Sequence, residues 1–228
     1  MTSNLLLLPG LLCDERLWRD VQSQLQASAL VADFTQDDSI AGMARRALEA
    51  APARFALAGL SMGGYVALEI MRQAPERVTH LALLDTSARA DDDARRETRR
   101  KGIEMVGQGR FIGVSRGLLG NLLAPHHLGT PLAAEVQAMS ERVGAQAYLR
   151  QQVGIMNRVD SRELLPSIAV PTLVGVGELD KLTSPELAEE MAGMIEGAEL
   201  VRFGDSAHLP TMENPAAVVE AMRVWLGR

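Results

Sequence analysis

Short apolar runs alternate along the chain with longer stretches in which apolar residues recur every three or four positions. The short runs are typical of strands buried in a parallel sheet, and the longer spacing is typical of amphipathic helices. The runs predict strands at residues 4–8, 28–32, 54–58, 79–84, 172–176 and 199–203. The stretches between them predict helices at residues 17–26, 40–50, 62–73, 185–195 and 215–226. This alternation predicts an α/β fold, with a mostly parallel sheet of about six strands flanked by helices.

The alternation is interrupted once, between the strand that ends near residue 84 and the strand that begins near residue 172. This interval is too long for a single crossover connection. Helical spacing over residues 105–123 and 133–156, with Gly- and Pro-containing turns around them, predicts helices here as well. We therefore expect a core made of residues 1–88 and 161–228, with a helical cap inserted at residues 89–160.

Composition and charge narrow the class of protein. Of the 228 residues, 47% are apolar and 23% are charged, which is typical of a folded globular protein. The net charge of −6 disfavours a nucleic-acid partner, because phosphate binding needs a basic surface. The one basic cluster, residues 95–101, follows three aspartates and contains Glu97. We interpret it as a helix face of mixed charge that is exposed to solvent.

Cysteine usage and the apolar runs bear on the compartment. A single cysteine, Cys13, excludes an internal disulfide and a metal cluster made of cysteines alone, and it fits a reducing cytoplasm. The apolar run at residues 5–8 is too short for a signal core or a membrane span. We expect a cytoplasmic protein without a membrane partner, as a monomer or a homodimer.

The strongest chemical signal is Gly59-Leu60-Ser61-Met62-Gly63, which follows a predicted strand and opens a predicted helix. A sharp turn from strand to helix needs small neighbours, and it would expose the Ser61 hydroxyl at the carboxyl edge of the sheet. The backbone N–H of Met62 would point to the same place, at the positive end of the helix dipole. The pattern predicts a nucleophilic serine with one oxyanion donor.

A serine hydroxyl needs a base, and the chain has four histidines. His80 lies inside a predicted strand, and His126 and His127 lie in the predicted insertion. His208 directly follows the last predicted strand, so its loop reaches the same sheet edge as Ser61. We therefore expect His208 to be the base.

The carboxylate that orients the base has several candidates. Asp180 lies just after the next-to-last predicted strand, again at the carboxyl edge. Asp85, Glu178 and Asp205 are the alternatives, of which Asp85 follows the fourth strand and Asp205 precedes His208 by three residues. The order Ser, Asp, His, with each residue on its own loop after a strand, favours Asp180.

The turn after the first predicted strand completes the expected site. Pro9-Gly10 can aim the backbone N–H of Leu11 at the oxyanion position beside the N–H of Met62. Cys13 follows closely but has no elbow of its own, so we expect a buried thiol there. The expected substrate-binding residues are candidates only: Phe111, Leu119 and Leu209.

The ordered motifs of this chain resemble the α/β-hydrolase superfamily over essentially its whole length. They lie at residues 7–11, 59–64, 75–78, 171–180, 204–208 and 213–215. The resemblance implies Ser61 as nucleophile, Asp180 as acid and His208 as base. It also implies an oxyanion hole made of the Leu11 and Met62 amides, and a helical cap after the fourth strand.

Two departures from the family pattern stand out. Many relatives carry His-Gly where this chain has Pro9-Gly10, a change that removes a side chain but keeps the backbone donors. Relatives also usually begin with an additional β-hairpin, whereas this sequence begins directly at the strand before the oxyanion loop. We therefore expect a reduced version of the fold, with six strands, all of them parallel.

The resemblance and the motifs lead to a serine hydrolase that cleaves a small carboxylic ester or lactone through an acyl-enzyme on Ser61. No metal or organic cofactor is expected, and the expected partner is a small ester-type substrate. A thioesterase or a cofactor-free perhydrolase could use the same three residues. A weakly catalytic receptor for a small ligand also stays open, because the fold alone does not specify function.

Overall fold

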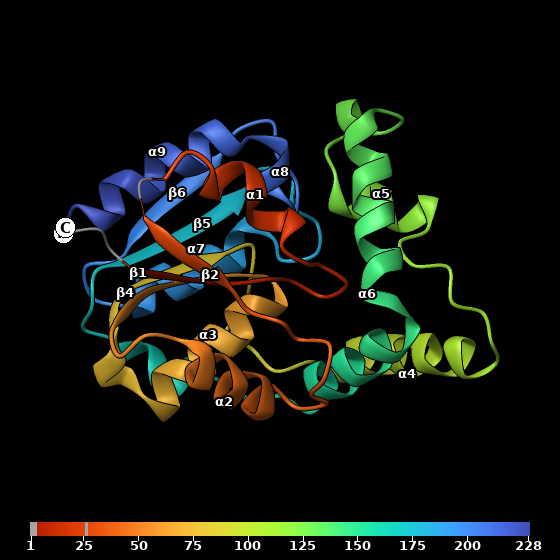
Figure 1. Cartoon of the computed structure of the whole chain (residues 1–228), viewed down its shortest axis with the longest axis horizontal. Helices are drawn as coiled ribbons and strands as arrows, with labels where there is room; N and C mark the ends of the chain where they lie inside the picture. The colour runs from red at the N-terminus through yellow and green to blue at the C-terminus, as the bar shows by residue number, and fades with distance from the viewer. Residues whose placement is uncertain (1–3, 26) are drawn as a thin grey trace.

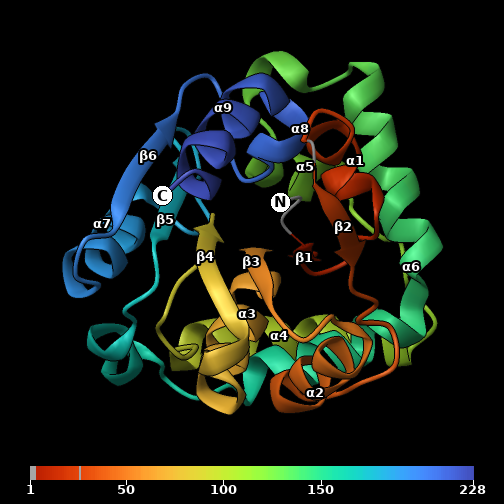
Figure 2. The same ribbon diagram turned by 60° about the vertical axis from the view of Figure 1, so that its left-hand side comes forward.

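The computed structural model of this protein describes residues 4–25 and 27–228. Its six-stranded sheet has the order β2-β1-β3-β4-β5-β6, and every neighbouring pair is parallel. Figure 2 shows the strands side by side in this order. The strands are β1 (Asn4–Leu8), β2 (Ser28–Val31), β3 (Phe55–Leu60), β4 (Val78–Leu84), β5 (Thr172–Gly177) and β6 (Glu199–Phe203). The predicted α/β fold with a parallel sheet is confirmed.

Helices cover both faces of this sheet, as Figure 1 shows. The even leucines of β1, Leu6 and Leu8, pack into one core layer, and the odd ones, Leu5 and Leu7, pack into the other. This alternation follows from the two-residue period of a strand, and it explains why β1 is apolar throughout. One face is covered by α2 (Ile40–Ala50), α3 (Met62–Gln73) and α7 (Pro185–Met194), and the other by α1 (Arg16–Gln22), α8 (Pro210–Glu213) and α9 (Pro215–Leu226).

In the core, the predicted boundaries agree closely with the observed ones, and most deviations are one or two residues. The first helix differs most, because it ends at Gln22 and the backbone turns at Ser23, whose N–H bonds Arg19 O. Residue 26, where that helix was expected to end, lies outside the described residues. Strand β3 also continues to Leu60, two residues beyond the prediction, and so leads directly into the turn at Ser61.

Three further helices lie between β4 and β5 and form the insertion, which projects to the right of the sheet in Figure 1. At its base, Ser161 N–H donates to Ala88 O at 2.7 Å and joins the two ends of the segment. The longest helix bends at Gly144, where φ is 78° and ψ is 171°. These helices are α4 (Asp93–Gly107), α5 (Arg116–Leu122) and α6 (Pro131–Met156). The helical spacing predicted over residues 105–123 is wrong for residues 108–115, where the backbone turns with a positive φ at Gly109 and Gly113 and separates α4 from α5.

Three short 3-10 helices join these elements: η1 (Pro75–Arg77), η2 (Pro125–His127) and η3 (Arg162–Ser167). None of the helices in the described part of the chain combines the length and the apolarity that a bilayer span requires.

Candidate active site

The turn between β3 and α3 presents Ser61 in a strained backbone conformation. Its φ is 55° and its ψ is −117°, a region that residues with a side chain rarely adopt. A Cβ atom on Gly63 would lie 2.1 Å from Leu8 O, and one on Gly59 would lie 2.3 Å from Gly63 O. Both positions therefore require glycine. The Thr86 hydroxyl donates to Ser61 O at 2.7 Å and further holds the turn.

A continuous hydrogen-bond chain runs from this serine to a buried carboxylate. Ser61 Oγ lies 2.9 Å from His208 Nε2, and His208 Nδ1 lies 2.8 Å from Asp180 Oδ2. Both His208 and Asp180 are buried. The structure thus brings together the three side chains that sequence reasoning singled out, each from its own loop after a strand.

Asp180 accepts more hydrogen bonds than the one from His208. The Thr183 hydroxyl donates to Asp180 Oδ2 at 2.7 Å, and the backbone N–H groups of Leu182 and Thr183 donate to Oδ1 at 2.8 and 3.2 Å. Burial alone would raise the pKa of Asp180, but His208 and these donors outweigh burial and lower that pKa. An ionised carboxylate only accepts, so His208 Nδ1 carries the proton and Nε2 is left to accept from Ser61.

Glu213, in α8, holds the loop on both sides of His208 in place. Its Oε1 accepts from Ala207 N–H at 2.9 Å and from Leu209 N–H at 3.1 Å. Its Oε2 accepts from Ala124 N–H, in the insertion, at 2.7 Å. Sequence reasoning assigned no role to Glu213, although the Glu-Asn-Pro motif at 213–215 was a signal that could have pointed to it.

The turn that follows β1 lies directly against the serine. A Cβ atom on Gly10 would be 3.4 Å from Ser61 Cβ. Within residues 4–25 and 27–228, no acceptor is paired with the backbone N–H of Leu11 or with that of Met62. Both amides are therefore free of protein acceptors in the described part of the chain.

Gln151, in α6, anchors the Leu11 turn and was not identified from the sequence. Its Oε1 accepts from Leu12 N–H at 3.0 Å, and its Nε2 donates to Phe34 O at 3.1 Å. Leu12 has a positive φ of 59°, so the turn is an unusual one. A glutamine on a helical segment carries no sequence signal for such a contact, because the contact joins residues 139 positions apart.

The alternative carboxylates fall into two kinds. Glu178 and Asp205 are exposed, whereas Asp85 is fully buried, with Oδ1 accepting from Gly177 N–H at 2.8 Å. Burial, and then the charge of Asp180, raise the pKa of Asp85 well above its ordinary value. Ligand atoms of Asp85, Asp180 and His208 lie within 4.8 Å of one another, so these are the residues that could approach a metal ion. Two neighbouring carboxyls do not both ionise readily, and the structure assigns the charge to Asp180.

The remaining nucleophile and base candidates lie outside the hydrogen-bond chain. Cys13 is half-buried and lines the cavity, which corrects the expectation of a buried thiol. Desolvation still raises the pKa of its thiol to about 12, and the thiol contacts Leu11 O at 3.5 Å, so the thiolate form is disfavoured. His80 packs edge-on against Trp225 with ring centroids 5.7 Å apart. His126 and His127 lie on η2, away from the cavity.

Ser61 and His208 open into a cavity of about 680 Å³ between the sheet edge and the insertion. Phe111 and Leu209 are part of its wall, as expected for substrate-binding candidates. Leu119 is not part of the wall, because its side chain is 5% exposed and packs into the core. The residues of α5 that line the cavity are Leu118 and Leu122. The apolar part of the wall also includes Leu11, Leu60, Met105, Val106, Ile112, Val114, Val136, Met139 and Ile155.

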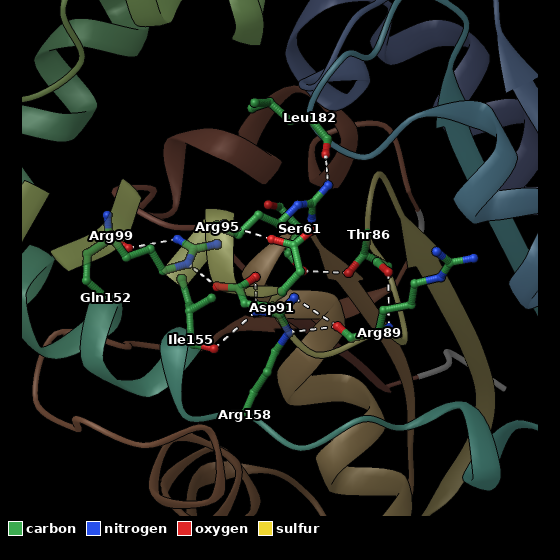
Figure 3. Close-up of polar contacts among 12 residues, drawn as sticks. Ser61, Thr86, Arg89, Asp91, Arg95, Arg99, Gln152, Ile155, Arg158 and Leu182 are labelled. Carbon is green, nitrogen blue, oxygen red and sulfur yellow. Dashed lines mark hydrogen bonds and ion pairs between the residues drawn. The ribbon is translucent and has the colours of Figure 1, made fainter. Parts of the chain in front are cut away.

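The basic cluster of α4 is only partly a solvent-exposed face, which corrects the expectation from sequence. Arg95, Thr98 and Arg99 line the cavity, whereas Arg100 and Lys101 are exposed. In Figure 3, Asp91 lies between Arg99 and Arg158. Helix periodicity places residues 95, 98 and 99 on one side of α4, but the sequence did not reveal that this side faces the cavity, because that depends on how α4 is docked.

This arrangement of strand, strained serine, histidine and buried carboxylate is that of an α/β serine hydrolase. The alpha/beta hydrolase family profile matches residues 5–221, so the chain belongs to the alpha/beta hydrolase family. The predicted resemblance is confirmed.

Two curated relatives and one solved structure illustrate this membership. A pimeloyl-acyl-carrier-protein methyl ester esterase from Neisseria meningitidis is 28% identical over 173 residues, which cover 72% of this chain and 66% of the relative. The match thus spans just under two thirds of the relative's length. A protein from Azorhizobium caulinodans, provisionally named carbamate hydrolase RutD, is 30% identical over 199 residues, covering 83% of this chain and 74% of the relative. The structure of a thermophilic esterase from Thermogutta terrifontis, with malate bound, superimposes with a TM-score of 0.91 at 28% identity, covering 100% of this chain and 90% of that one.

Proposed function

We propose that this protein is a serine hydrolase that cleaves a carboxylic ester through an acyl-enzyme on Ser61. The observation that carries the proposal is the hydrogen-bond chain from Ser61 Oγ to His208 Nε2 at 2.9 Å and from His208 Nδ1 to Asp180 at 2.8 Å. The names of relatives support ester bonds as the target, since two of the proteins described above are called esterases.

In the first half of the proposed reaction, Ser61 Oγ attacks the ester carbonyl carbon while His208 Nε2 takes the hydroxyl proton. The carbonyl oxygen becomes an oxyanion that accepts from the Leu11 and Met62 amides, each contributing about 3 kcal/mol in comparable sites. The tetrahedral intermediate then breaks its bond to the alcohol oxygen. His208 donates its proton to that oxygen, and an acyl-Ser61 ester remains.

In the second half, His208 Nε2 takes a proton from water, and the resulting hydroxide oxygen bonds to the acyl carbon. The bond from that carbon to Ser61 Oγ breaks, and His208 returns the proton to the serine. Asp180 stays ionised throughout and holds the imidazole, which is why its lowered pKa supports this role. The products are a carboxylic acid and an alcohol.

We assign residues 89–160 as a cap that encloses the substrate. This assignment is supported by the Ser161-to-Ala88 hydrogen bond at 2.7 Å, which closes the segment at its base. It is also supported by the cavity wall, to which α4, α5 and α6 contribute side chains opposite Ser61. Enclosure by apolar side chains would exclude water and strengthen the polar contacts at the reacting carbonyl.

The test is hydrolysis of p-nitrophenyl esters of increasing acyl length by the native protein and by Ser61→Ala. We expect native turnover with a preference for one chain length, and a loss of at least about a thousandfold in the variant. Mass spectrometry of rapidly quenched mixtures should show an acyl adduct on Ser61. The proposal fails if native protein and variant have equal rates on every ester.

A further inference from the structure

The charged part of the cavity wall is not needed for ester cleavage. Four basic residues, Arg95, Arg99, Arg110 and Lys181, line the cavity that contains Ser61, against one acidic lining residue, Asp92. A simple alkyl ester carries no charge, and it would be bound by the apolar wall alone. Ester cleavage therefore does not explain why basic residues outnumber acidic ones on the cavity wall of a protein whose net charge is −6.

Arg99 already has hydrogen-bond partners within the protein. Its Nε bonds Asp91 Oδ2, and its Nη1 bonds Gln152 Oε1 at 2.7 Å. Asp91 also accepts from Arg158 Nη1 at 2.8 Å, so one buried carboxylate serves two guanidinium groups. This cluster joins α4 to the C-terminal part of α6 within the insertion, and its one carboxylate and two guanidinium groups leave one positive charge uncompensated beside the cavity.

Arg95 differs from Arg99 in having no acidic partner. Its Nη2 donates to the carbonyl oxygen of Leu182 at 3.2 Å, as Figure 3 shows. Within the part of the chain that the structure describes, no Asp or Glu forms an ion pair with the Arg95 side chain. The Asp92 carboxylate is used as the helix cap, since its Oδ1 accepts from the Arg95 backbone N–H at 2.8 Å.

The position of Arg95 suits recognition rather than a bulk electrostatic effect. The side chain is half-buried, unlike the exposed Arg110 and Lys181, and the Leu182 contact limits its movement. Leu182 belongs to the loop that donates to Asp180, so the guanidinium lies next to the catalytic loop. One contact to Leu182 leaves most of the five guanidinium donors for a ligand, and their planar fork matches a carboxylate.

We propose that Arg95 is a specificity-determining residue that binds a carboxylate, and that the preferred substrates are esters that also carry a free carboxylate group. This inference rests on the proposed ester hydrolysis and names its substrate class. The carboxylate could be part of the acyl group or part of the alcohol. The apolar wall around Met105 and Phe111 would then accept the remainder of the substrate.

Matched substrate pairs test the inference. In the acyl arm, the p-nitrophenyl monoester of glutaric acid is compared with the same ester of glutaramic acid, which has a neutral amide in place of the carboxylate. In the alcohol arm, the butyrate ester of 4-hydroxybenzoic acid is compared with that of 4-hydroxybenzamide. Native protein should prefer the carboxylate in one arm, and that arm identifies which part of the substrate Arg95 binds.

The variants are Arg95→Gln, Arg95→Lys and, as a matched control, Arg100→Gln, which removes a positive charge from the exposed side of α4. Arg95→Gln should lower kcat/KM for the carboxylate substrate roughly tenfold to hundredfold, mainly through KM, the range typical of a lost charged hydrogen bond. The neutral substrate should change less than about threefold. Arg95→Lys should retain part of the preference, because it keeps the charge and loses the fork.

Two results would overturn the inference. Arg95→Gln could slow both members of a pair equally, which would make Arg95 a support for the Leu182 loop and nothing more. Native protein could also lack a carboxylate preference in both arms. In either case, hydrolysis of the neutral esters above the Ser61→Ala background would leave the proposed function standing, so the two failures are distinguishable.

Discussion

The α/β core and the helical insertion are held together by different kinds of contact. Around Ser61 the core is packed backbone against backbone, since a Cβ on Gly63 or on Gly177 would lie within 2.1 Å of a main-chain oxygen. The insertion is held to the core chiefly through side-chain hydrogen bonds of the buried Gln151 and the half-buried Glu213, and the buried Asp91 joins helices within the insertion. Backbone packing leaves no room for variation, whereas side-chain anchors can be exchanged one at a time.

This difference separates two tasks in the molecule. The core positions the atoms proposed to carry out the chemistry, and their placement depends on strand ends and glycines. The insertion supplies much of the cavity wall, including the Arg95 and Phe111 side chains. Substitutions in the core should therefore act on kcat, and substitutions in the insertion should act on substrate preference and stability.

The largest expected effect tests the core. Asp180→Asn keeps the shape but removes the acceptor that sets the His208 tautomer, so kcat for any accepted ester should fall about ten-thousandfold. Steady-state kinetics on the best ester of the p-nitrophenyl series measures this.

Two matched controls belong to that prediction. Asp205→Asn, at an exposed position near His208, should change kcat less than about twofold. Asp85→Asn should retain most activity, because the raised pKa of Asp85 favours its neutral form and Asn keeps an acceptor for Gly177 N–H. A collapse with Asp85→Asn similar to that with Asp180→Asn would contradict the assignment of the acid.

The second effect tests the charged cluster that holds the helices of the insertion to one another. Asp91→Asn leaves the charges of Arg99 and Arg158 without their buried partner, so the free energy of unfolding should fall by about 3–5 kcal/mol. Urea denaturation followed by circular dichroism measures the change. The exposed pair of Asp160 with Arg162 is the control, and Asp160→Asn should cost about 1 kcal/mol or less. Equal losses of unfolding free energy in Asp91→Asn and Asp160→Asn would mean that the burial of Asp91 does not increase the effect of its ion pairs on stability.

A smaller effect tests the bend that lets α6 contact two parts of the core. At Gly144 the φ of 78° and ψ of 171° are accessible essentially to glycine alone, while the space around a Cβ is empty. Gly144→Ala should therefore destabilise the protein by about 1–3 kcal/mol through backbone strain without a steric clash. Gly107→Ala, in α4 with equally open space, is the control and should be neutral or slightly stabilising. A thermal unfolding midpoint unchanged by Gly144→Ala would show that α6 straightens at no cost.

The smallest expected effect is the pH dependence of stability that two carboxyl groups, those of Asp91 and Glu213, contribute. Burial acts to raise the pKa of Asp91, but its two arginines prevail and lower that pKa below 3.8. Its contribution to stability is therefore present above 3.8 and lost as the pH falls through the folded value. Burial raises the pKa of Glu213 above 4.5, so its contribution declines as the pH rises from 4.5 through the folded value.

Urea titrations between about pH 3 and pH 7 measure both slopes against the variants Asp91→Asn and Glu213→Gln. The stability difference between native protein and Asp91→Asn should shrink toward low pH. The difference between native protein and Glu213→Gln should shrink toward high pH. Slopes of the same sign for the two residues would contradict the pKa directions.

Much of the core could be predicted because its information is local. The strand at Asn4–Leu8 and the helices at Ile40–Ala50 and Met62–Gln73 were predicted to the residue from apolar spacing and turn chemistry. The three residues of the hydrogen-bond chain also followed, since each lies directly after a strand and parallel strands end at one edge. The substrate-binding candidates were less successful, because Leu119 faces the core and Leu118 the cavity.

The amino-acid order along the chain was thus sufficient for the α/β sheet, the elbow at Ser61 and the choice of His208 among four histidines. It was not sufficient to identify Gln151 and Glu213 as anchors. It also did not show which arginines of α4 line the cavity and which are exposed to solvent. Hydrophobic period and turn residues act between near neighbours, so they can be read from local sequence. The direction of a charged side chain depends on which surface its helix docks against. For Arg95, that surface is the Leu182 loop, 87 positions away, and only folding brings the two together.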